Sequence, residues 1–114
     1  FQPDLGNCGG FGQFNELAAV AAMKNIAMAP HNPNGPLSVA QGLQAMASIR
    51  NGHILETVGN ESEDQLAMDI LENPEEIKSK DGYINLPKGP GLGVKLNYEG
   101  IKKRPFKHYY HTTR

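Results

Sequence analysis

Apolar positions along this chain first follow the period of an amphipathic helix. Between Gly12 and Asn25 apolar side chains recur at i, i+3, i+4 and i+7, and these are Phe14, Leu17, Ala18 and Ala21. One face of this segment is therefore apolar and the other polar. The pattern predicts a helix that is buried along one side.

A second helical pattern begins at Ser38. Ser38 and Gln41 have the spacing of a capping box, in which each side chain pairs with a free backbone N–H of the first turn. The apolar stripe that follows consists of Val39, Leu43, Met46 and Ala47. Asn51 and Gly52 are typical of the end of a helix, so a helix is expected from Ser38 to about residue 50.

Short apolar segments alternate with these two helices. The run 26–29 is continuous and apolar, as expected of a strand covered on both faces, and residues 53–56 are expected to form another short buried strand. Residues 1–4 have the character of a strand already in progress, so the chain is expected to be a piece of a larger protein. Parallel strands joined by right-handed helical crossovers are the economical interpretation.

The pattern changes after Glu56. Residues 61–76 are acidic and predict only a short helix over 65–72, which should end at Asn73 and Pro74. A turn is expected at 80–82, a short strand at 83–86 and a Gly/Pro-rich loop at 87–93. The acidic carboxylates do not converge, so a solvated helix face is favoured over a metal site.

Composition then limits the function. A chain of 114 residues with 39% hydrophobic residues can form one modest domain. The net charge of -1 gives no general attraction to nucleic acid or an anionic membrane, and no apolar run reaches membrane-spanning length. The single cysteine, Cys8, excludes an internal disulfide. A cytoplasmic protein without nucleic-acid or membrane partners is expected.

Candidate chemistry lies at the ends of the three expected strands. Asp4, His31 and Glu56 are separated by 27 and 25 residues, about one strand–helix unit each. Parallel strands would bring them to one rim, where an Asp can fix the tautomer of a His and a buried Glu can donate a proton. Each residue alone also has a structural interpretation: a cap for Asp4, a loop residue for His31 and a solvated strand end for Glu56.

Four segments carry a family resemblance: Gln2–Gly10, Ala29–Pro36, Ile54–Glu56 and Gly89–Val94. In this order they resemble the C-terminal part of the mandelate racemase-like branch of the enolase superfamily. The similarity is greatest to its sugar-acid dehydratases, of the galactonate and gluconate type. It extends from the first residues to about Arg104.

The resemblance implies an α/β fold, the C-terminal portion of a modified TIM barrel. Strands six, seven and eight would end at Asp4, His31 and Glu56. Residues 1–72 would form the last βα units, and 73–114 would form a tail that returns towards an N-terminal capping domain. The full protein is then expected to bind a sugar acid and to form a homo-oligomer.

The resemblance also implies roles for the three site residues. Family enzymes remove the proton α to a carboxylate and stabilise the product on Mg²⁺. His31 would be the general acid that helps the β-hydroxyl leave, Asp4 would orient it, and Glu56 would lie near the substrate carboxylate. The Mg²⁺ ligands and a second acid–base residue are expected on earlier strands, so this chain alone should neither bind the metal properly nor turn over substrate.

The expected function is that of a hydro-lyase that converts an aldonate to a 2-keto-3-deoxy acid. A racemase or epimerase on the same scaffold is an alternative, because the same His–Asp pair can return a proton instead of expelling hydroxide. A third possibility is a non-catalytic assembly module. Three βα units cannot close an eight-stranded barrel, so the exposed strand edges would require a partner.

Overall fold

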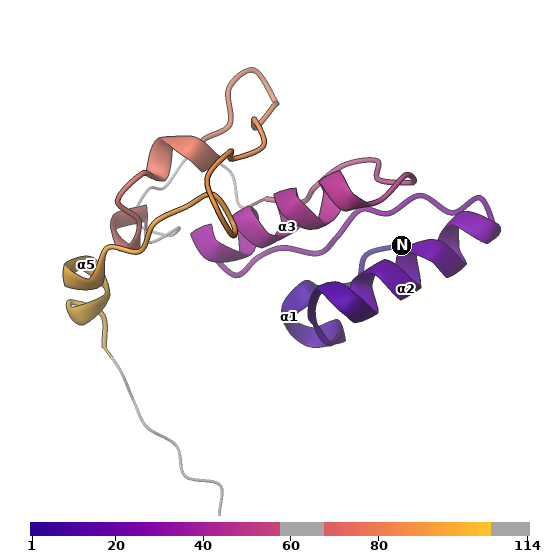
Figure 1. The fold of residues 1–114 in the computed structure, drawn as a ribbon, viewed down its shortest axis with the longest axis horizontal. Helices are drawn as coiled ribbons and strands as arrows, with labels where there is room; N and C mark the ends of the chain where they lie inside the picture. Colours follow the sequence, from indigo (N-terminus) through magenta and orange to yellow (C-terminus); the bar gives the residue numbers. More distant parts are fainter. Residues whose placement is uncertain (58–67, 106–114) are drawn as a thin grey trace, which may run out of the picture.

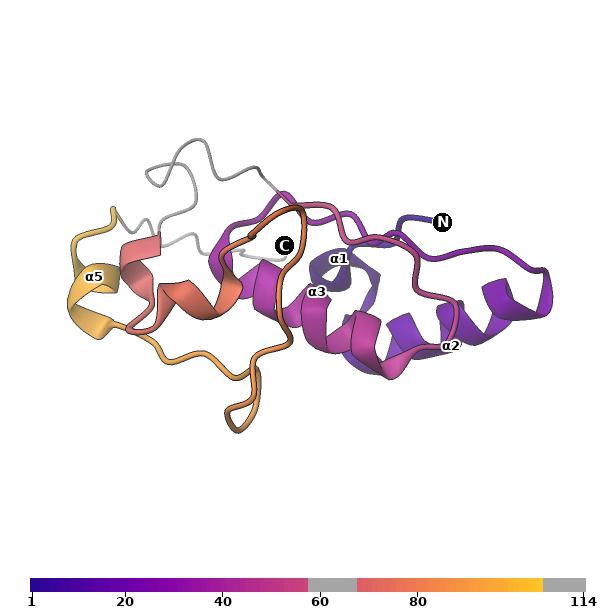
Figure 2. The same cartoon turned by 90° about the horizontal axis from the view of Figure 1, so that it is seen from above.

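The computed structural model describes residues 1–57 and 68–105, and Figure 1 shows their arrangement. Three helices, α1, α2 and α3, contact one another, and α2 and α3 carry the two expected helical patterns. From above, residues 68–105 gather beside the N-terminal half of α3, opposite α2 (Figure 2). The helices are α1 (Leu5–Cys8), α2 (Gly10–Met23), α3 (Pro36–Ser48), η1 (Met68–Ile70), η2 (Pro74–Ile77) and α5 (Tyr98–Lys102).

Helix α2 confirms the first amphipathic pattern. It begins after Gly9, whose φ of 105° lies in the left-handed region and separates α2 from the short helix α1. Phe14, Ala18 and Ala21 are buried on one face of the helix. Phe14 has no exposed surface, so it is the main apolar anchor of α2.

Helix α3 confirms the second pattern but corrects its beginning. It starts at Pro36, because a proline at the first helical position needs no N–H partner and already has a helical φ. The capping box at Ser38 and Gln41 is therefore wrong, and Ser38 Oγ instead donates a hydrogen bond to Asn32 Oδ1. Ala47 also lies at an exposed position.

The apolar stripe of α3 differs from the expected one because α3 packs against two separate clusters. Ala45 belongs to a first cluster with α1, α2 and Met28, whereas Val39 and Ala40 belong to a second cluster with residues from 68 to 96. Helix α3 is thus buried along two lines instead of one. It joins the N-terminal helices to the later part of the chain.

The three segments that were expected to be strands run parallel and pair through hydrogen bonds. Phe1 N donates to Ala27 O (2.8 Å), and Ala29 N donates to Phe1 O (2.9 Å). Met28 N donates to Asn51 O (2.8 Å), and His53 N donates to Met28 O (2.9 Å). The segment around Met28 therefore lies between the other two, in parallel register.

This pairing is shorter than the sequence pattern predicts. Within the described residues, the Met28–Gly52 contact is an isolated parallel bridge, and no segment has the length of a β-strand. The next donor of each parallel ladder would be Pro3 or Pro30, and proline has no backbone N–H. The prolines therefore end the pairing immediately before Asp4 and His31.

The later part of the chain folds back on itself and on α3. Glu72 N donates to Lys95 O (2.9 Å), and Asn97 N donates to Ile70 O (2.7 Å), which pairs these segments in antiparallel fashion around the Leu71–Leu96 bridge. The side chain of Gln44 on α3 donates to Pro87 O (3.1 Å). Helix α3 thus holds the start of the Gly/Pro-rich loop.

The turn expected at 80–82 is confirmed. Lys80 and Tyr83 exchange two backbone hydrogen bonds, and Asp81 and Gly82 have φ values of 53° and 81°. These dihedrals favour the tight reversal of a hairpin.

The strand expected at 83–86 is not formed. Only Met68–Ile70 of the expected 65–72 region is helical among its described residues, and positions 58–67 lie outside the description.

Gly93 closes the Gly/Pro-rich loop and gives a stability prediction. Its φ is 77°, and a Cβ there would lie 2.4 Å from Pro87 Cβ. Gly93→Ala should therefore destabilise the fold by about 2 kcal/mol or more, through backbone strain and a steric clash. Thermal unfolding followed by circular dichroism measures this loss.

Gly91→Ala is the matched control for Gly93→Ala. Gly91 also has a positive φ, of 65°, but a Cβ there has no neighbour within 4 Å. It should cost only the strain of the left-handed conformation, about 1 kcal/mol. Equal melting temperatures for the two variants would show that the contact with Pro87 does not close the loop.

Candidate active site

Asp4 is held at the beginning of α1. Its side chain caps this helix, because Oδ1 accepts a hydrogen bond from Gly6 N at 2.7 Å. Its backbone oxygen accepts from Cys8 N at 2.8 Å. The residue is only 9% exposed, so its carboxylate has a fixed position in a mostly buried environment.

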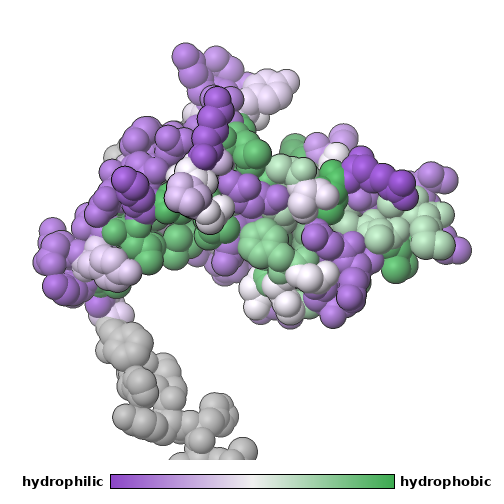
Figure 3. All heavy atoms as spheres, viewed as in Figure 1, coloured by the Kyte–Doolittle hydropathy of each residue, from purple (hydrophilic) through white to green (hydrophobic). Residues whose placement is uncertain are grey.

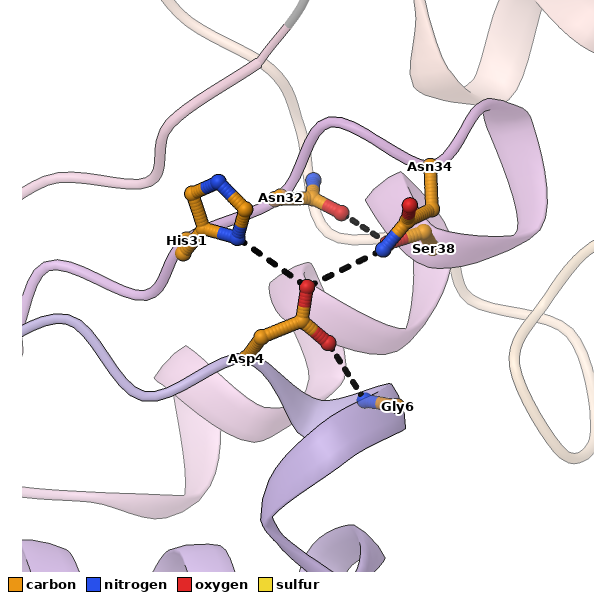
Figure 4. Close-up of polar contacts among 6 residues, drawn as sticks. All are labelled: Asp4, Gly6, His31, Asn32, Asn34 and Ser38. Atoms are coloured by element: carbon orange, nitrogen blue, oxygen red, sulfur yellow. Dashed lines mark hydrogen bonds and ion pairs between the residues drawn. The ribbon is translucent and has the colours of Figure 1, made fainter.

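His31 lies beside Asp4, as Figure 4 shows. His31 Nδ1 is 3.1 Å from Asp4 Oδ2, although the two residues are 27 positions apart in the sequence. A deprotonated carboxylate has no proton to give, so Nδ1 must carry the hydrogen. The His31 side chain is 48% exposed, which leaves its other ring nitrogen, Nε2, available to a substrate.

A second side chain donates to the same carboxylate oxygen. Asn34 Nδ2 is 3.0 Å from Asp4 Oδ2 and comes from the turn between His31 and α3 (Figure 4). The Asp4 carboxylate therefore accepts hydrogen bonds from Gly6, His31 and Asn34. This arrangement fixes the carboxylate more firmly than a His–Asp pair alone.

Asn32 anchors the turn that carries His31 and Asn34. It is 2% exposed, and its Oδ1 accepts the hydrogen bond from Ser38 Oγ on α3. Within residues 1–57 and 68–105, Asn32 Nδ2 is the one buried side-chain polar atom without a hydrogen-bond partner. The pair of Asn32 and Ser38 connects the candidate site to the helix that joins both clusters.

Glu56 is not brought into this network. It lies four residues beyond Gly52 of the Met28–Gly52 bridge and is exposed. It forms no hydrogen bond or ion pair with Asp4 or His31. Of the three residues that the sequence suggests, Asp4 and His31 are therefore in contact and Glu56 is not. A catalytic role for Glu56 stays a prediction.

The surroundings of Asp4 favour its ionised form. Burial of the carboxylate raises the pKa of Asp4. The hydrogen bonds from His31, Gly6 and Asn7, together with the charge of His31, lower this pKa by a larger amount. The net result is a pKa below the ordinary value of 3.8. Asp4 is thus a carboxylate at neutral pH and can accept the hydrogen of His31 Nδ1.

The lowered pKa of Asp4 predicts a pH dependence of stability. A carboxyl group with a lower pKa in the folded state stabilises the fold above its unfolded pKa, near 4, and this contribution is lost as the pH falls through the folded pKa. The melting temperature of the wild type should therefore exceed that of Asp4→Asn at pH 6, and the difference should shrink below about pH 4. A constant difference from pH 3 to pH 7 would contradict the assignment.

The described residues do not provide a metal site. In the ranges 1–57 and 68–105, no group of three or more His, Cys, Asp or Glu side chains is placed to hold a metal ion. Asp4 already accepts three hydrogen bonds, which leaves it poorly suited as a ligand. The acidic residues 61–67 lie outside the described part, as do residues 106–114.

No helix in the described part is long and apolar enough to span a membrane.

Comparison with known proteins places the chain in a family. The family described as enolase C-terminal domain-like matches residues 1–100, so the chain belongs to this family. It is 35% identical over 106 residues to a D-galactonate dehydratase of Xanthomonas campestris, covering 90% of this chain and 27% of that protein. It is 29% identical over 107 residues to a D-galactarolactone cycloisomerase of Agrobacterium fabrum, covering 88% of this chain and 28% of that protein.

Solved structures support the same assignment. A mandelate racemase/muconate lactonizing enzyme from Jannaschia matches with a TM-score of 0.78 and 26% identity, over 96% of this chain and 27% of that one. An enolase from Agrobacterium radiobacter, crystallised with Na and L-malate, matches with a TM-score of 0.78 and 27% identity, over 99% of this chain and 31% of that one. The chain therefore has the fold of part of the enolase superfamily (β/α)-barrel, and it spans about a quarter to a third of these proteins.

Sequence reasoning missed Asn34 and the Asn32–Ser38 pair. An Asn-Pro-Asn-Gly-Pro turn is usually explained by local turn chemistry, and nothing in the pattern assigns an asparagine there to a distant carboxylate. The spacing of Ser38 and Gln41 fits a capping box, which predicts a different role for the Ser38 side chain. Pro36 is the signal in the sequence that the helix begins earlier, because proline is favoured at the first helical position.

Proposed function

We propose that this chain supplies the His–Asp pair of a Mg²⁺-dependent sugar-acid dehydratase. The observation that carries the proposal is the contact of 3.1 Å between His31 Nδ1 and Asp4 Oδ2, with the carboxylate held by two further donors. The enolase C-terminal domain-like family and the D-galactonate dehydratase relatives support it. The reaction converts an aldonate to a 2-keto-3-deoxy acid and water.

His31 acts as the general acid in this proposal. Once the α-proton of the substrate has been removed by another group of the enzyme, the protonated His31 donates its Nε2 proton to the β-hydroxyl. The C3–O bond breaks, its electron pair stays with the oxygen that leaves as water, and the electrons of the enolate form the C2–C3 double bond. His31 is left neutral with its remaining hydrogen on Nδ1. The enol that is formed takes up a proton from water at C3 and loses the proton of its C2 hydroxyl, which gives the 2-keto-3-deoxy acid.

Asp4 keeps His31 in the required state. Its carboxylate accepts the Nδ1 hydrogen, which holds the imidazole in one tautomer and directs Nε2 outward. The negative charge of Asp4 also favours the protonated imidazole before the proton is donated. Glu56 is proposed to lie near the substrate carboxylate when the rest of the barrel is present.

The remaining parts of the site belong to strands outside this chain. We assign residues 1–72 to the last βα units, with strands six, seven and eight ending at Asp4, His31 and Glu56. Residues 73–114 form the closing tail. We assign the Mg²⁺ ligands and the base to earlier strands, as the resemblance to the enolase superfamily implies.

Exposed apolar side chains agree with this partial barrel. Figure 3 shows hydrophobic residues at the surface among hydrophilic ones. Met23 and Val20 of α2 are 78% and 62% exposed, and Ile54 of the third extended segment is 62% exposed. Further barrel strands or helices would cover such positions. We refer to the polypeptide that contains this chain together with those strands as the complete enzyme.

A racemase, epimerase or cycloisomerase is the second candidate. The similarity to the D-galactarolactone cycloisomerase favours it, because a protonated His can return a proton to carbon as well as to oxygen. The residues that would separate these reactions lie on the missing strands. The presence of the His–Asp pair alone is compatible with both.

A product assay tests the proposed function. The complete enzyme is incubated with Mg²⁺ and a panel of aldonates and aldarates, and the 2-keto-3-deoxy product is detected as its semicarbazone by ultraviolet absorbance. We expect product from at least one sugar acid. A change in optical rotation without any keto acid would support the racemase or epimerase, and no change with any substrate would contradict both enzymatic candidates.

A further inference from the structure

Asn34 has a position that the proposed reaction does not yet explain. The residue is exposed in the turn before α3, yet its amide nitrogen reaches back to the mostly buried carboxylate of Asp4 at 3.0 Å. It shares the oxygen Oδ2 with His31 Nδ1, whereas Oδ1 is occupied by Gly6 N. Figure 4 shows the two donors converging on Oδ2 from different sides.

The local backbone presents Asn34 in this direction. Gly35, the next residue, has a φ of 91° and a ψ of -170°, a conformation that is essentially restricted to glycine. Ser38 and Asn32 fix the other side of the same turn through their hydrogen bond. The turn is therefore anchored on both sides of Asn34, and a chance surface contact is a poor explanation for its hydrogen bond to Asp4.

We propose that Asn34 is a positioning residue for the Asp4–His31 pair, one that holds the carboxylate with Oδ2 facing His31 Nδ1 and shares the negative charge of that oxygen. The inference rests on the proposed function, because it assigns Asn34 a part in the proton donation by His31. The terminal torsion of an aspartate is broad, so one donor does not set the plane of its carboxylate. Donors from three places in the chain set it here.

His31 and Asn34 share the negative charge of Asp4 Oδ2. The amide hydrogens of Asn34 carry partial positive charge but no net charge, so they reduce the pull of Asp4 on the His31 proton without removing the ion pair. Without Asn34, His31 Nδ1 would be the one side-chain donor left on this oxygen. Within the described residues, Asp4 is the charged side chain in contact with His31, and Glu56 forms no bond to it.

The experiment replaces Asn34 in the complete enzyme. Asn34→Ala removes the donor, and Asn34→Asp keeps the size of the side chain but replaces the donor with a negative charge. The His31 ring signals are followed by ¹⁵N-edited NMR against pH, and they are assigned by their loss in His31→Asn. Dehydration is measured in parallel as kcat and KM across the same pH range.

We expect the His31 titration to move to higher pH in Asn34→Ala and further in Asn34→Asp. The alkaline limb of the kcat profile should move in the same direction, because His31 must be protonated to act. Removal of one hydrogen bond to a charged group should lower kcat about three- to tenfold, with a smaller change in KM. Asn15→Ala is the control: Asn15 is exposed on α2 and bonds to Ser48, so its loss should leave the titration unchanged.

Two results would overturn the inference. If the variants melt at a lower temperature but His31 titrates as in the wild type, Asn34 only shapes the turn. If the titration moves to lower pH, the assigned effect on the carboxylate is wrong. The NMR titration needs no substrate, so a shift of the expected sign in an enzyme that does not dehydrate sugar acids would contradict the proposed function while leaving the positioning role intact.

Discussion

Replacing His31 by Asn in the complete enzyme is expected to lower kcat for dehydration by about 10²- to 10⁴-fold, the usual contribution of a general acid. An Asn amide can still donate a hydrogen bond to Asp4, so the loss should come from the missing proton donor and not from local unfolding. The 48% exposed side chain makes few packing contacts that the change would remove. The measurement is kcat and KM with the best sugar acid, together with a melting curve.

His53→Asn is the matched control for His31→Asn. His53 is exposed on the neighbouring extended segment, and its backbone contributes the hydrogen bond to Met28 O, which the substitution retains. Its kcat should stay within about twofold of the wild type, as expected of a surface substitution. A wild-type kcat in His31→Asn would contradict the assignment of His31 as the acid. An equal decrease of kcat in His31→Asn and His53→Asn would contradict it as well.

Asp4→Asn is expected to lower kcat about 100-fold while leaving α1 in place. Asn is as good a helix cap as Asp, so its oxygen can still accept the hydrogen bond from Gly6 N. The amide group that replaces Oδ2 cannot accept from His31 or Asn34, and the negative charge is lost. His31 then has no fixed tautomer and no counter-ion, which disfavours its protonated form.

The pH profile separates this effect from general damage. In Asp4→Asn the alkaline limb of kcat should move to lower pH, the opposite direction to that expected for Asn34→Ala. Asp81→Asn serves as the control, because Asp81 is exposed in the turn at 80–82 with a φ of 53° that Asn also tolerates. A wild-type pH profile in Asp4→Asn would refute the role of Asp4.

The convergence of Asp4 and His31 could be predicted from sequence because it depends on periodicity. Parallel segments separated by helices of similar length place equivalent ends together, and the pairing of residues 1, 28 and 52 has this register. The two main helices were predictable for the same reason. Their apolar residues recur with a period that only a helix brings to one side.

The rest depended on particular contacts that a pattern does not contain. The extended segments are short because Pro3 and Pro30 interrupt the ladders, an effect that follows only when the register of pairing is known. Helix α3 is buried along two lines because a second cluster forms on residues far along the chain. Asn34 joins the site through a single long-range hydrogen bond, and no sequence period encodes such a bond.

The most direct test of the central claim is to follow His31→Asn in D₂O with a sugar acid that the wild-type complete enzyme dehydrates. If His31 is the acid and the base lies on another strand, the variant should exchange the α-hydrogen for deuterium, as seen by ¹H NMR, but form almost no 2-keto-3-deoxy acid. Exchange and dehydration that persist together at the wild-type rate would contradict the claim. Loss of α-hydrogen exchange in a variant that still folds and binds the sugar acid would also contradict it, since His31 would then be needed before the hydroxyl leaves.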